Sequence, residues 1–186
     1  MAYPQQLSIV IYGNPILQQR AKEVSAVSEE QEALAKRMFE LMYASHGVGL
    51  AAPQVGISER IIVLDGSCVA PAATPKALAN PVILKRSRRR HVAVEGCLSL
   101  PGIEGQVPRA WQIRVRAIQL GHGPVEFDTE GFEARIIQHE LDHLDGVLFI
   151  DRLPCLKRRK LKRLLSRQLA QCATGATTRT EQPALL

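Results

Sequence analysis

At 186 residues the chain is long enough for one domain that buries its own hydrophobic core. Its charged fraction is 23%, its formal net charge is +6, and no apolar run approaches the roughly 18 residues of a membrane span, so we expect a soluble, cytoplasmic protein that does not enter membranes. We also expect neither export, because the first residues lack a basic and apolar leader, nor a disulfide framework, because the four cysteines are scattered.

The first elements in chain order are a short strand and a helix. Residues 7–12 form an apolar run closed by a Gly-Asn-Pro turn, which predicts a strand. Ser28 and Gln31 have the spacing of a capping box, and apolar residues follow them at helical intervals. We expect this helix to end near Gly47.

The middle of the chain reads as strands. Residues 60–65 are rich in β-branched residues, which predicts a buried strand. Two apolar segments, residues 81–84 and 91–94, flank a basic cluster at 85–90, and we expect this cluster to be the tip of a hairpin. Residues 113–120 alternate broadly between apolar and polar residues, as a half-solvated strand does.

The last third contains a strand and two helices. A Gly-rich turn at 121–124 leads into a strand at 125–128. A helix is expected from about Phe132 to Leu144, with Gly146 placed to end it. Another is expected over residues 156–172, where leucines and a cysteine share one stripe.

This order of elements predicts an α+β fold. We expect largely antiparallel or mixed sheets packed around one central helix, with a further helix at the C-terminal end. Residues 1–172 are expected to form this single catalytic domain. Residues 173–186 are Thr-rich and lack periodicity, so we expect a disordered tail there.

The strongest chemical signal lies on the helix at 132–144, where His139 to His143 read His-Glu-Leu-Asp-His. Histidines at positions i and i+4 share one helix face, close enough for both imidazoles to bind one metal ion. Glu140 between them is placed to act as a general base. A charged surface helix that matches the pattern by chance is the alternative.

A hydrolytic metal site needs a third protein ligand and an open position for water. The downstream positions used by zincin-type endopeptidases hold Phe149 and a Lys/Arg-rich stretch, which argues against that class. Cys97, in the segment Glu-Gly-Cys-Leu-Ser, is the best upstream candidate, and a thiolate with two imidazoles suits Zn or Fe(II). Taken singly, Cys97 is better explained as a buried structural thiol.

A third segment, residues 47–54, is dense in Gly and Ala and ends in Gln54. Small residues let a backbone approach a ligand closely, and the Gln54 amide offers an N–H donor. A Gly/Ala-rich connection between a helix and a strand explains the segment equally well.

Together the three segments resemble the signature motifs of the peptide deformylase family. Those motifs read G-x-G-x-A-A-x-Q, E-G-C-L-S and Q-H-E-x-D-H, and here they stand in this order at 47–54, 95–99 and 138–143. The resemblance extends over roughly residues 7–153. It implies a metal-dependent hydrolase that removes the N-formyl group from the formylmethionine of nascent polypeptides and releases formate.

The resemblance also implies a role for each motif residue. One divalent ion, Fe(II) in the cell with Zn(II), Ni(II) or Co(II) as substitutes, would be held by Cys97, His139 and His143. Glu140 would be the general acid and base, while the Gln54 side chain and the Leu98 backbone N–H would stabilise the oxyanion.

Further positions would bind the substrate. The backbone of Val48, Gly49 and Gly96 would pair with an extended formylmethionyl peptide. Phe132 and Ile136 precede His139 by seven and three residues, so they share its helix face and would line a pocket for the methionine side chain. Ordinary core packing explains these two residues equally well.

Basic residues are unevenly distributed. Residues 157–167 carry seven basic and no acidic residues, and the cluster at 85–90 adds a second patch, which favours a polyanionic partner. In the family context we expect the C-terminal helix to contact the ribosome, and we expect a monomer. A solvated basic helix without a partner is the alternative.

A non-catalytic ribosome-binding module with a structural metal is the remaining rival. Such a site is normally closed by four protein ligands, and no fourth His or Cys is close in sequence. His46 and His91 are the more distant candidates, for which surface or loop roles are expected.

Overall fold

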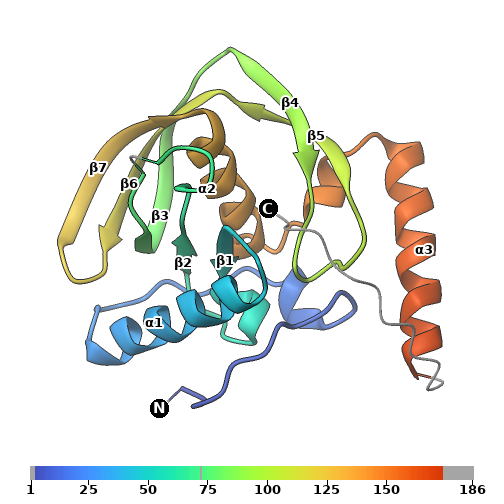
Figure 1. The fold of residues 1–186 in the computed structure, drawn as a ribbon, viewed down its shortest axis with the longest axis horizontal. Helices are drawn as coiled ribbons and strands as arrows, with labels where there is room; N and C mark the ends of the chain where they lie inside the picture. Colours follow the sequence, from blue (N-terminus) through green and yellow to red (C-terminus); the bar gives the residue numbers. More distant parts are fainter. Residues whose placement is uncertain (1–2, 72, 174–186) are drawn as a thin grey trace.

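Two antiparallel sheets frame the protein in the computed structural model, which describes residues 3–71 and 73–173, from 168 onward by the backbone alone (Figure 1). The larger sheet has the order β1-β2-β3-β6-β7 and is formed by Gly49–Ala51, Ile61–Leu64, Lys76–Arg86, Gln112–Gln119 and Gly123–Glu130. The smaller sheet pairs β4 (Arg90–Glu95) with β5 (Gly105–Ala110).

Two helices sandwich the larger sheet. The helix α1 (Glu29–Ala44) packs on β1 and β2, and its apolar side shares a core cluster with Ile61 and Val63. The helix α2 (Gly131–Leu144) runs between the two sheets and contacts strands of both (Figure 1). The predicted α+β fold around a buried central helix is confirmed.

The remaining helical elements lie at the edges. Three short 3₁₀ turns cover Pro15–Gln18, Ala52–Val55 and Phe149–Arg152, and the last leads into α3 (Cys155–Ala173). Among the described residues, no helix is both long and apolar enough to cross a membrane.

Local capping explains where α1 begins and where α2 ends. The Ser28 backbone N–H donates to Gln31 Oε1 at 3.0 Å, and Ser28 Oγ accepts from the Glu30 N–H at 3.3 Å, which confirms the capping box. Gly146 has a φ of +71° just beyond α2, and a Cβ there would lie 2.7 Å from the Gln18 backbone. Glycine therefore ends α2 and also admits the N-terminal segment beside it.

Residues 7–12 do not form the expected strand. The Val10 N–H donates to Gln54 O and the Tyr12 N–H to Ser99 O, both at 2.8 Å. Because these two bonds reach different segments, no ladder forms. The extended segment instead ties two of the three sequence motifs together.

The expected hairpin over residues 81–94 is also wrong. The strands β3 and β4 form, but they belong to different sheets. Both edges of β3 are already occupied by β2 and β6, so β4 pairs with β5 instead. The basic cluster therefore lies on a crossover between sheets.

The other predicted strands are confirmed. All four residues of β2 are buried, while in β6 the buried Ile113, Val115 and Ala117 alternate with exposed polar residues. The short strands β1 and β5 were not anticipated.

The C-terminal helix is observed, and its apolar stripe is confirmed where side chains are described. Leu165 is buried against the cluster of β5 and the preceding 3₁₀ turn, and Leu161 packs beside it. Leu169 and Cys172 lie beyond the described side chains. The expected tail lies outside the described residues, apart from Ala173 at the end of α3.

Candidate active site

Cys97, His139 and His143 meet in the interior. One ligand atom from each lies within 4.8 Å of the other two, and all three side chains are buried. Cys97 Sγ is 3.2 Å from His143 Nε2. A thiolate and two imidazoles in this arrangement fit a soft or borderline divalent ion such as Zn or Fe(II).

The helix α2 presents both histidines because they are one turn apart on the same face. Every residue from Ala134 to Leu144 is buried, so the pattern does not lie on a charged surface helix. Cys97 comes from the turn that follows β4, where Leu100 N–H donates to Cys97 O at 2.9 Å. The position of β4 therefore places the Cys97 thiol next to α2.

A buried carboxylate orients His139. The Nδ1 atom of His139 is 3.0 Å from Glu95 Oε2, which leaves the Nε2 atom of His139 for a metal. Carboxylate contacts of this kind fix the tautomer and the ring orientation of metal-binding histidines. Burial raises the pKa of Glu95, but hydrogen bonds from Arg109 and His139 outweigh it and hold the pKa far below the usual range.

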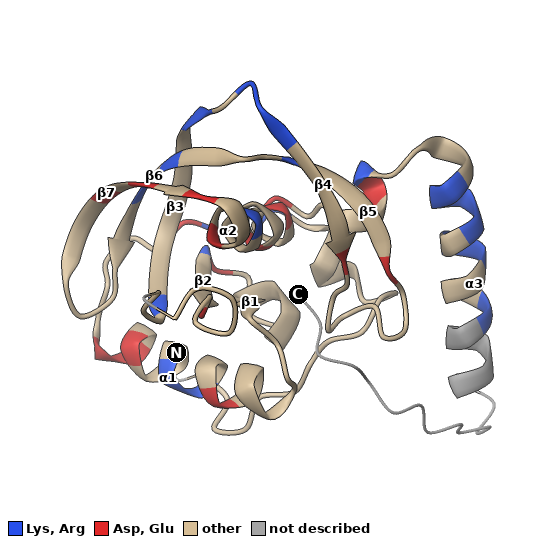
Figure 2. Cartoon of the chain, turned by 45° about the horizontal axis from the view of Figure 1, so that its top comes forward, with Lys and Arg blue, Asp and Glu red and all other residues tan. Residues whose placement is uncertain are grey.

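Three arginines surround this carboxylate and a second one. Arg109 donates to Glu95 at 2.8 and 2.9 Å and to Asp142 at 2.6 Å. Arg135 donates to Glu95 at 2.6 Å, and Arg152 donates to Asp142 at 2.5 and 3.1 Å. Figure 2 shows acidic and basic positions meeting around α2. This network joins α2 to both strands of the smaller sheet.

Gln138 makes a further clip between α2 and β5. Its Oε1 accepts from the Ala110 N–H at 3.1 Å, and its Nε2 donates to the Ala110 carbonyl at 3.0 Å. The Gln138 amide thus satisfies both the N–H and the carbonyl of Ala110 at the end of β5. These two hydrogen bonds help to hold the helix against the end of β5.

Glu140 points into the same interior space. It is 1% exposed, and its Oε2 has no hydrogen-bond partner among the described residues. Burial raises the pKa of Glu140 to about 7. A Cβ at Gly49 would overlap the Glu140 carboxylate and would lie 2.7 Å from Ile136 Cγ2. The missing side chain at Gly49 therefore lets β1 approach the site.

Gln54 and Leu98 lie beside the thiol. Gln54 Oε1 accepts from the Ala51 N–H at 2.8 Å, which fixes the amide, and its Nε2 is 3.4 Å from both Cys97 Sγ and Ser99 Oγ. The Leu98 N–H has no acceptor among the described residues. Two N–H donors thus lie next to Cys97, one from the Gln54 amide and one from the following residue, Leu98.

The expected substrate residues also converge. Ile136 is buried, and Val48 and Phe132 are half-buried against the core cluster that contains it. Gly49 begins β1, an edge strand of the larger sheet whose other edge pairs with β2. Gly96 is buried between Glu95 and Cys97.

The alternative fourth ligands are not at the site. His46 and His91 are exposed, and His91 packs edge-on against Trp111 with a ring separation of 5.6 Å. Within the described residues the cluster has three ligand side chains, as expected of a site with one open position. A closed structural site is not supported.

The network of buried ion pairs that supports the site was not predicted from the sequence. One signal was available. Val107 and Arg109 occupy alternate positions of β5 and are both buried, so a charged residue stands at an inward strand position. Such a residue needs a buried partner.

Arg109→Met is expected to lower the free energy of unfolding by about 3–5 kcal/mol, because it strips a buried carboxylate of its main partner. Urea denaturation of the chain measures this change. Arg114→Met is the matched control, since Arg114 pairs with Asp128 on the exposed face of β6, where solvent screens the pair. Equal midpoints for the two variants would show that the network does not stabilise the fold.

Comparisons with known proteins agree on one family. The family described as polypeptide deformylase matches residues 6–159. A peptide deformylase from Desulforudis audaxviator is 44% identical over 152 residues, which cover 82% of this chain and 96% of the relative. One from Acidobacterium capsulatum is 49% identical over 150 residues, covering 81% of this chain and 88% of the relative.

Solved structures lead to the same result. The peptide deformylase of Thermus thermophilus superposes with a TM-score of 0.80 at 39% identity, covering 91% of this chain and 98% of that one. A plant peptide deformylase superposes with a TM-score of 0.85 at 32% identity, covering 99% of each chain. The chain therefore belongs to the peptide deformylases, the metal-dependent hydrolases that remove the N-formyl group from nascent polypeptides.

Proposed function

We propose that Cys97, His139 and His143 hold one divalent ion and that Fe(II) is its native identity. The observation that carries the proposal is the convergence of these three buried donors beside the unpaired Oε2 of Glu140. Both sulfur and imidazole ligands are compatible with Fe(II), Ni(II), Co(II) and Zn(II). Residues 1–172 would form the single catalytic domain around this centre.

Bound to Cys97, His139 and His143, such an ion would supply Lewis-acid chemistry, which would lower the pKa of a water molecule and polarise the formyl oxygen. Glu140 accepts a proton from the attacking water and then delivers it to the leaving amine, as a general acid and base. Water attack on the formyl carbon and cleavage of its C–N bond yield formate and a free amino terminus. No other described side chain near the three donors is a buried, unpaired carboxylate.

Gln54 and Leu98 would stabilise the negative charge that develops on the formyl oxygen. The Gln54 amide is already fixed by its bond from Ala51, so little ordering is needed when the charge develops. The free N–H of Leu98 provides the second donor. Two preorganised donors of this kind are worth most where water is excluded.

The substrate would bind as an added strand. Because β1 is an edge strand, the backbone at Gly49 has an unpaired side on which an extended peptide can form hydrogen bonds. Val48 precedes β1, and its carbonyl accepts from the Asp65 N–H at 2.9 Å; we propose that its backbone also contacts the peptide. Gly96 would contact the peptide from the opposite side. We propose that Val48, Phe132 and Ile136 line the pocket for the methionine side chain, which their shared cluster supports.

Removal and restoration of the metal test this function. Formate release from formyl-Met-Ala-Ser is expected to stop after chelation and to return when Fe(II), Ni(II) or Zn(II) is added under anaerobic conditions. The order of restored rates ranks the metals. Formate release that survives complete removal of metal would contradict the proposal.

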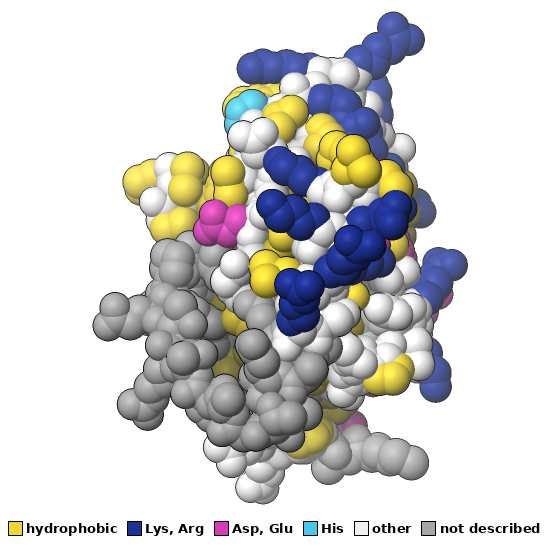
Figure 3. Space-filling view, turned by 90° about the vertical axis from the view of Figure 1, so that its right-hand side faces the viewer, with side chains coloured by type: hydrophobic (Ala, Val, Ile, Leu, Met, Phe, Trp, Pro, Cys, Tyr) yellow, Lys and Arg dark blue, Asp and Glu magenta, His cyan; other side chains and the backbone are white. Residues whose placement is uncertain are grey.

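We also propose that α3 contacts the ribosome and that the protein acts as a cytoplasmic monomer on emerging chains. Leu161 and Leu165 dock α3 on the body, which leaves Lys157, Arg159, Lys160, Arg163 and Arg167 exposed, while Lys162 pairs with Asp151 at 2.9 Å. Figure 3 shows these basic side chains spread over the face that carries α3. Such a surface suits the phosphates of ribosomal RNA.

Neutralising α3 is expected to weaken ribosome binding without affecting hydrolysis. The variant changes Lys157, Arg158, Arg159 and Lys160 to Gln, which removes four charges from residues that lie outside the metal centre. Co-sedimentation with ribosomes at several salt concentrations measures the effect, and formate release from a short peptide is the control. Unchanged, equally salt-sensitive sedimentation would refute the role of α3.

A further inference from the structure

A cleft lies beside α2, away from the three metal-binding side chains. This cleft of about 760 Å³ is lined by Leu141, Asp142 and Asp145 of the helix end and by Pro81–Ile83 of β3. The metal centre uses His139, Glu140 and His143, which project from a different face of α2. The cleft is therefore separate from the deformylase site.

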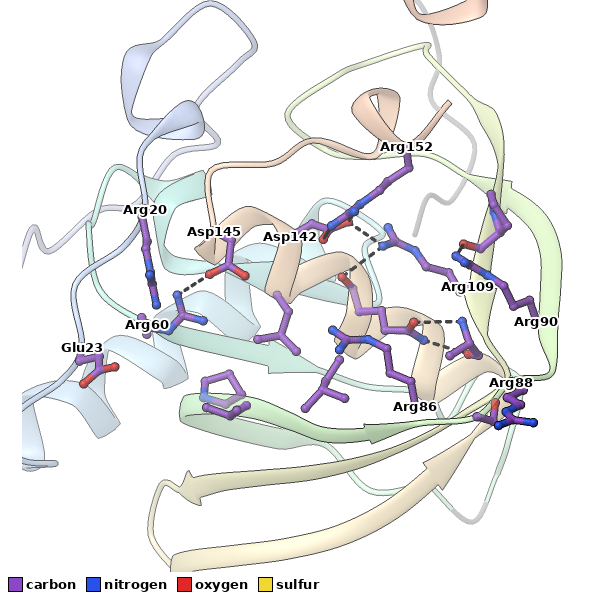
Figure 4. A pocket seen from close by; sticks show the side chains of 18 residues that line it. Arg20, Glu23, Arg60, Arg86, Arg88, Arg90, Arg109, Asp142, Asp145 and Arg152 are labelled. Atoms are coloured by element: carbon purple, nitrogen blue, oxygen red, sulfur yellow. Dashed lines mark hydrogen bonds and ion pairs between the residues drawn. The ribbon is translucent and has the colours of Figure 1, made fainter. Parts of the chain in front are cut away.

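Arginine dominates the lining. Seven arginines and three acidic residues surround the cleft, so its charge is strongly positive. At its floor the acids are already paired: Arg60 with Asp145 at 2.8 Å, and Arg109 and Arg152 with Asp142 (Figure 4). The floor contributes little free charge to a ligand.

The rim is different. The side chains of Arg20, Arg86 and Arg88 have no hydrogen-bond or ion-pair partner within residues 3–71 and 73–167. The Arg90 side chain donates to the Pro108 carbonyl at 2.8 Å. All four side chains are exposed, and Figure 4 shows Arg20 on one side of the cleft and the other three across it. Glu23 is the acidic residue of this rim, and it makes no ion pair with them.

The crossover between β3 and β4 holds three of these arginines in place. Arg86 ends β3, Arg90 begins β4 and the backbone bends at Arg88 between them, so all three arginines line the cleft from one short connection. Ser87 is fixed by two hydrogen bonds with the Gln112 backbone, at 2.9 and 3.1 Å. Arg89 turns the other way and stacks over the Trp111 ring at 4.4 Å. Such a fixed backbone reduces the entropy that binding would cost.

We propose that this cleft binds the phosphate backbone of RNA through Arg20, Arg86, Arg88 and Arg90. A repeated anion matches a row of cations on an open rim, because each neutralised phosphate releases counterions and the gains add along the polymer. A small free anion would meet only exposed side chains that compete with water. Guanidinium groups are also the cations best suited to phosphate oxygens.

The position of the crossover supports a long ligand. Figure 3 shows basic side chains continuing from α3 to the upper edge of the molecule, where Figure 1 places the connection between β3 and β4. An extended nucleic acid could contact both regions, while a mononucleotide could not. Val82, which is 46% exposed, and Ile83 add an apolar surface inside the cleft for a base.

The test compares two double variants of the metal-loaded full-length protein. Arg86→Gln with Arg88→Gln removes two rim charges, and Lys36→Gln with Arg37→Gln removes two charges from α1, outside the cleft. Fluorescence anisotropy with labelled oligouridine measures affinity over a range of salt concentrations. The cleft variant is expected to bind about 20-fold more weakly at roughly 0.1 M salt, with a salt slope smaller by about 1.4, while the α1 variant stays close to wild type.

Three results would overturn the proposal. The first is equal RNA affinity for the two variants. The second is displacement of the RNA by inorganic tripolyphosphate at concentrations that match the RNA affinity, which would assign the cleft to a small polyphosphate. The third is loss of formate release from a short formylated peptide in the cleft variant, since that would place these arginines in the deformylase site. Wild-type formate release together with weakened RNA binding supports a separate RNA site. This result does not depend on which metal the enzyme holds or on whether α3 contacts the ribosome.

Discussion

Glu140→Gln is expected to retain its metal ion and to lose about 10²–10⁴-fold in turnover. The amide has nearly the same shape as the carboxylate, so it fits the narrow space between α2 and Gly49. It cannot accept the proton of the attacking water. The measurements are kcat for formate release and metal content by elemental analysis of the same sample.

Glu133→Gln is the matched control on the same helix. Glu133 pairs with Lys76 at 2.6 Å and lies two turns before Glu140, away from the three donors. We expect this variant to keep both its metal and its activity. A fully active Glu140→Gln protein would remove Glu140 from the mechanism, and loss of metal from that variant would make it a structural residue.

The helix that carries the candidate site could be predicted because its signals are local. His139 and His143 are one turn apart, so helix geometry alone places them on the same face. The capping box at Ser28 and Gln31 is equally local, and the structure confirms it. Cys97 is different: no local geometry links it to the histidines, so it was proposed from its ligand chemistry and from the order of the three motifs.

The two wrong strand predictions both concern long-range pairing. The segments around β3 and β4 each have a strand-like composition, but composition does not specify a partner. The structure pairs β3 with β6, about 30 residues further along the chain. The connection after β3 leads instead to β4 in the second sheet. Residues 7–12 likewise form single bonds to distant loops where a ladder was expected.

The ionic network was hidden for a related reason. Glu95, Arg109 and Asp142 come from β4, β5 and α2, and charged residues in isolation are usually read as surface residues. Their burial becomes evident only when the smaller sheet packs on α2. Had β5 been predicted as a strand, the alternation of Val107 and Arg109 would have indicated a buried charge that needs a partner.

Cys97→Ser is expected to lose more of the bound metal than Glu140→Gln does. Outer-shell partners of a metal site typically contribute about 10–100-fold in affinity, and a direct ligand should contribute more. Serine keeps nearly the size of the side chain but replaces a thiolate with a hydroxyl, which is a poor ligand for Fe(II) or Zn(II). Cys97 is fully buried, so solvent cannot replace the lost ligand easily.

Metal retained after dialysis against a chelator measures this effect, and Cys68→Ser is the control because Cys68 is exposed. If Cys97 were only a buried structural thiol, Cys97→Ser would keep its metal and lose stability in urea. If it is a ligand, metal and formate release fall together, and added Zn(II) restores neither at concentrations that saturate the Cys68→Ser protein. Comparison with Glu140→Gln then separates the two roles, because one variant loses the ion and the other loses proton transfer with the ion in place.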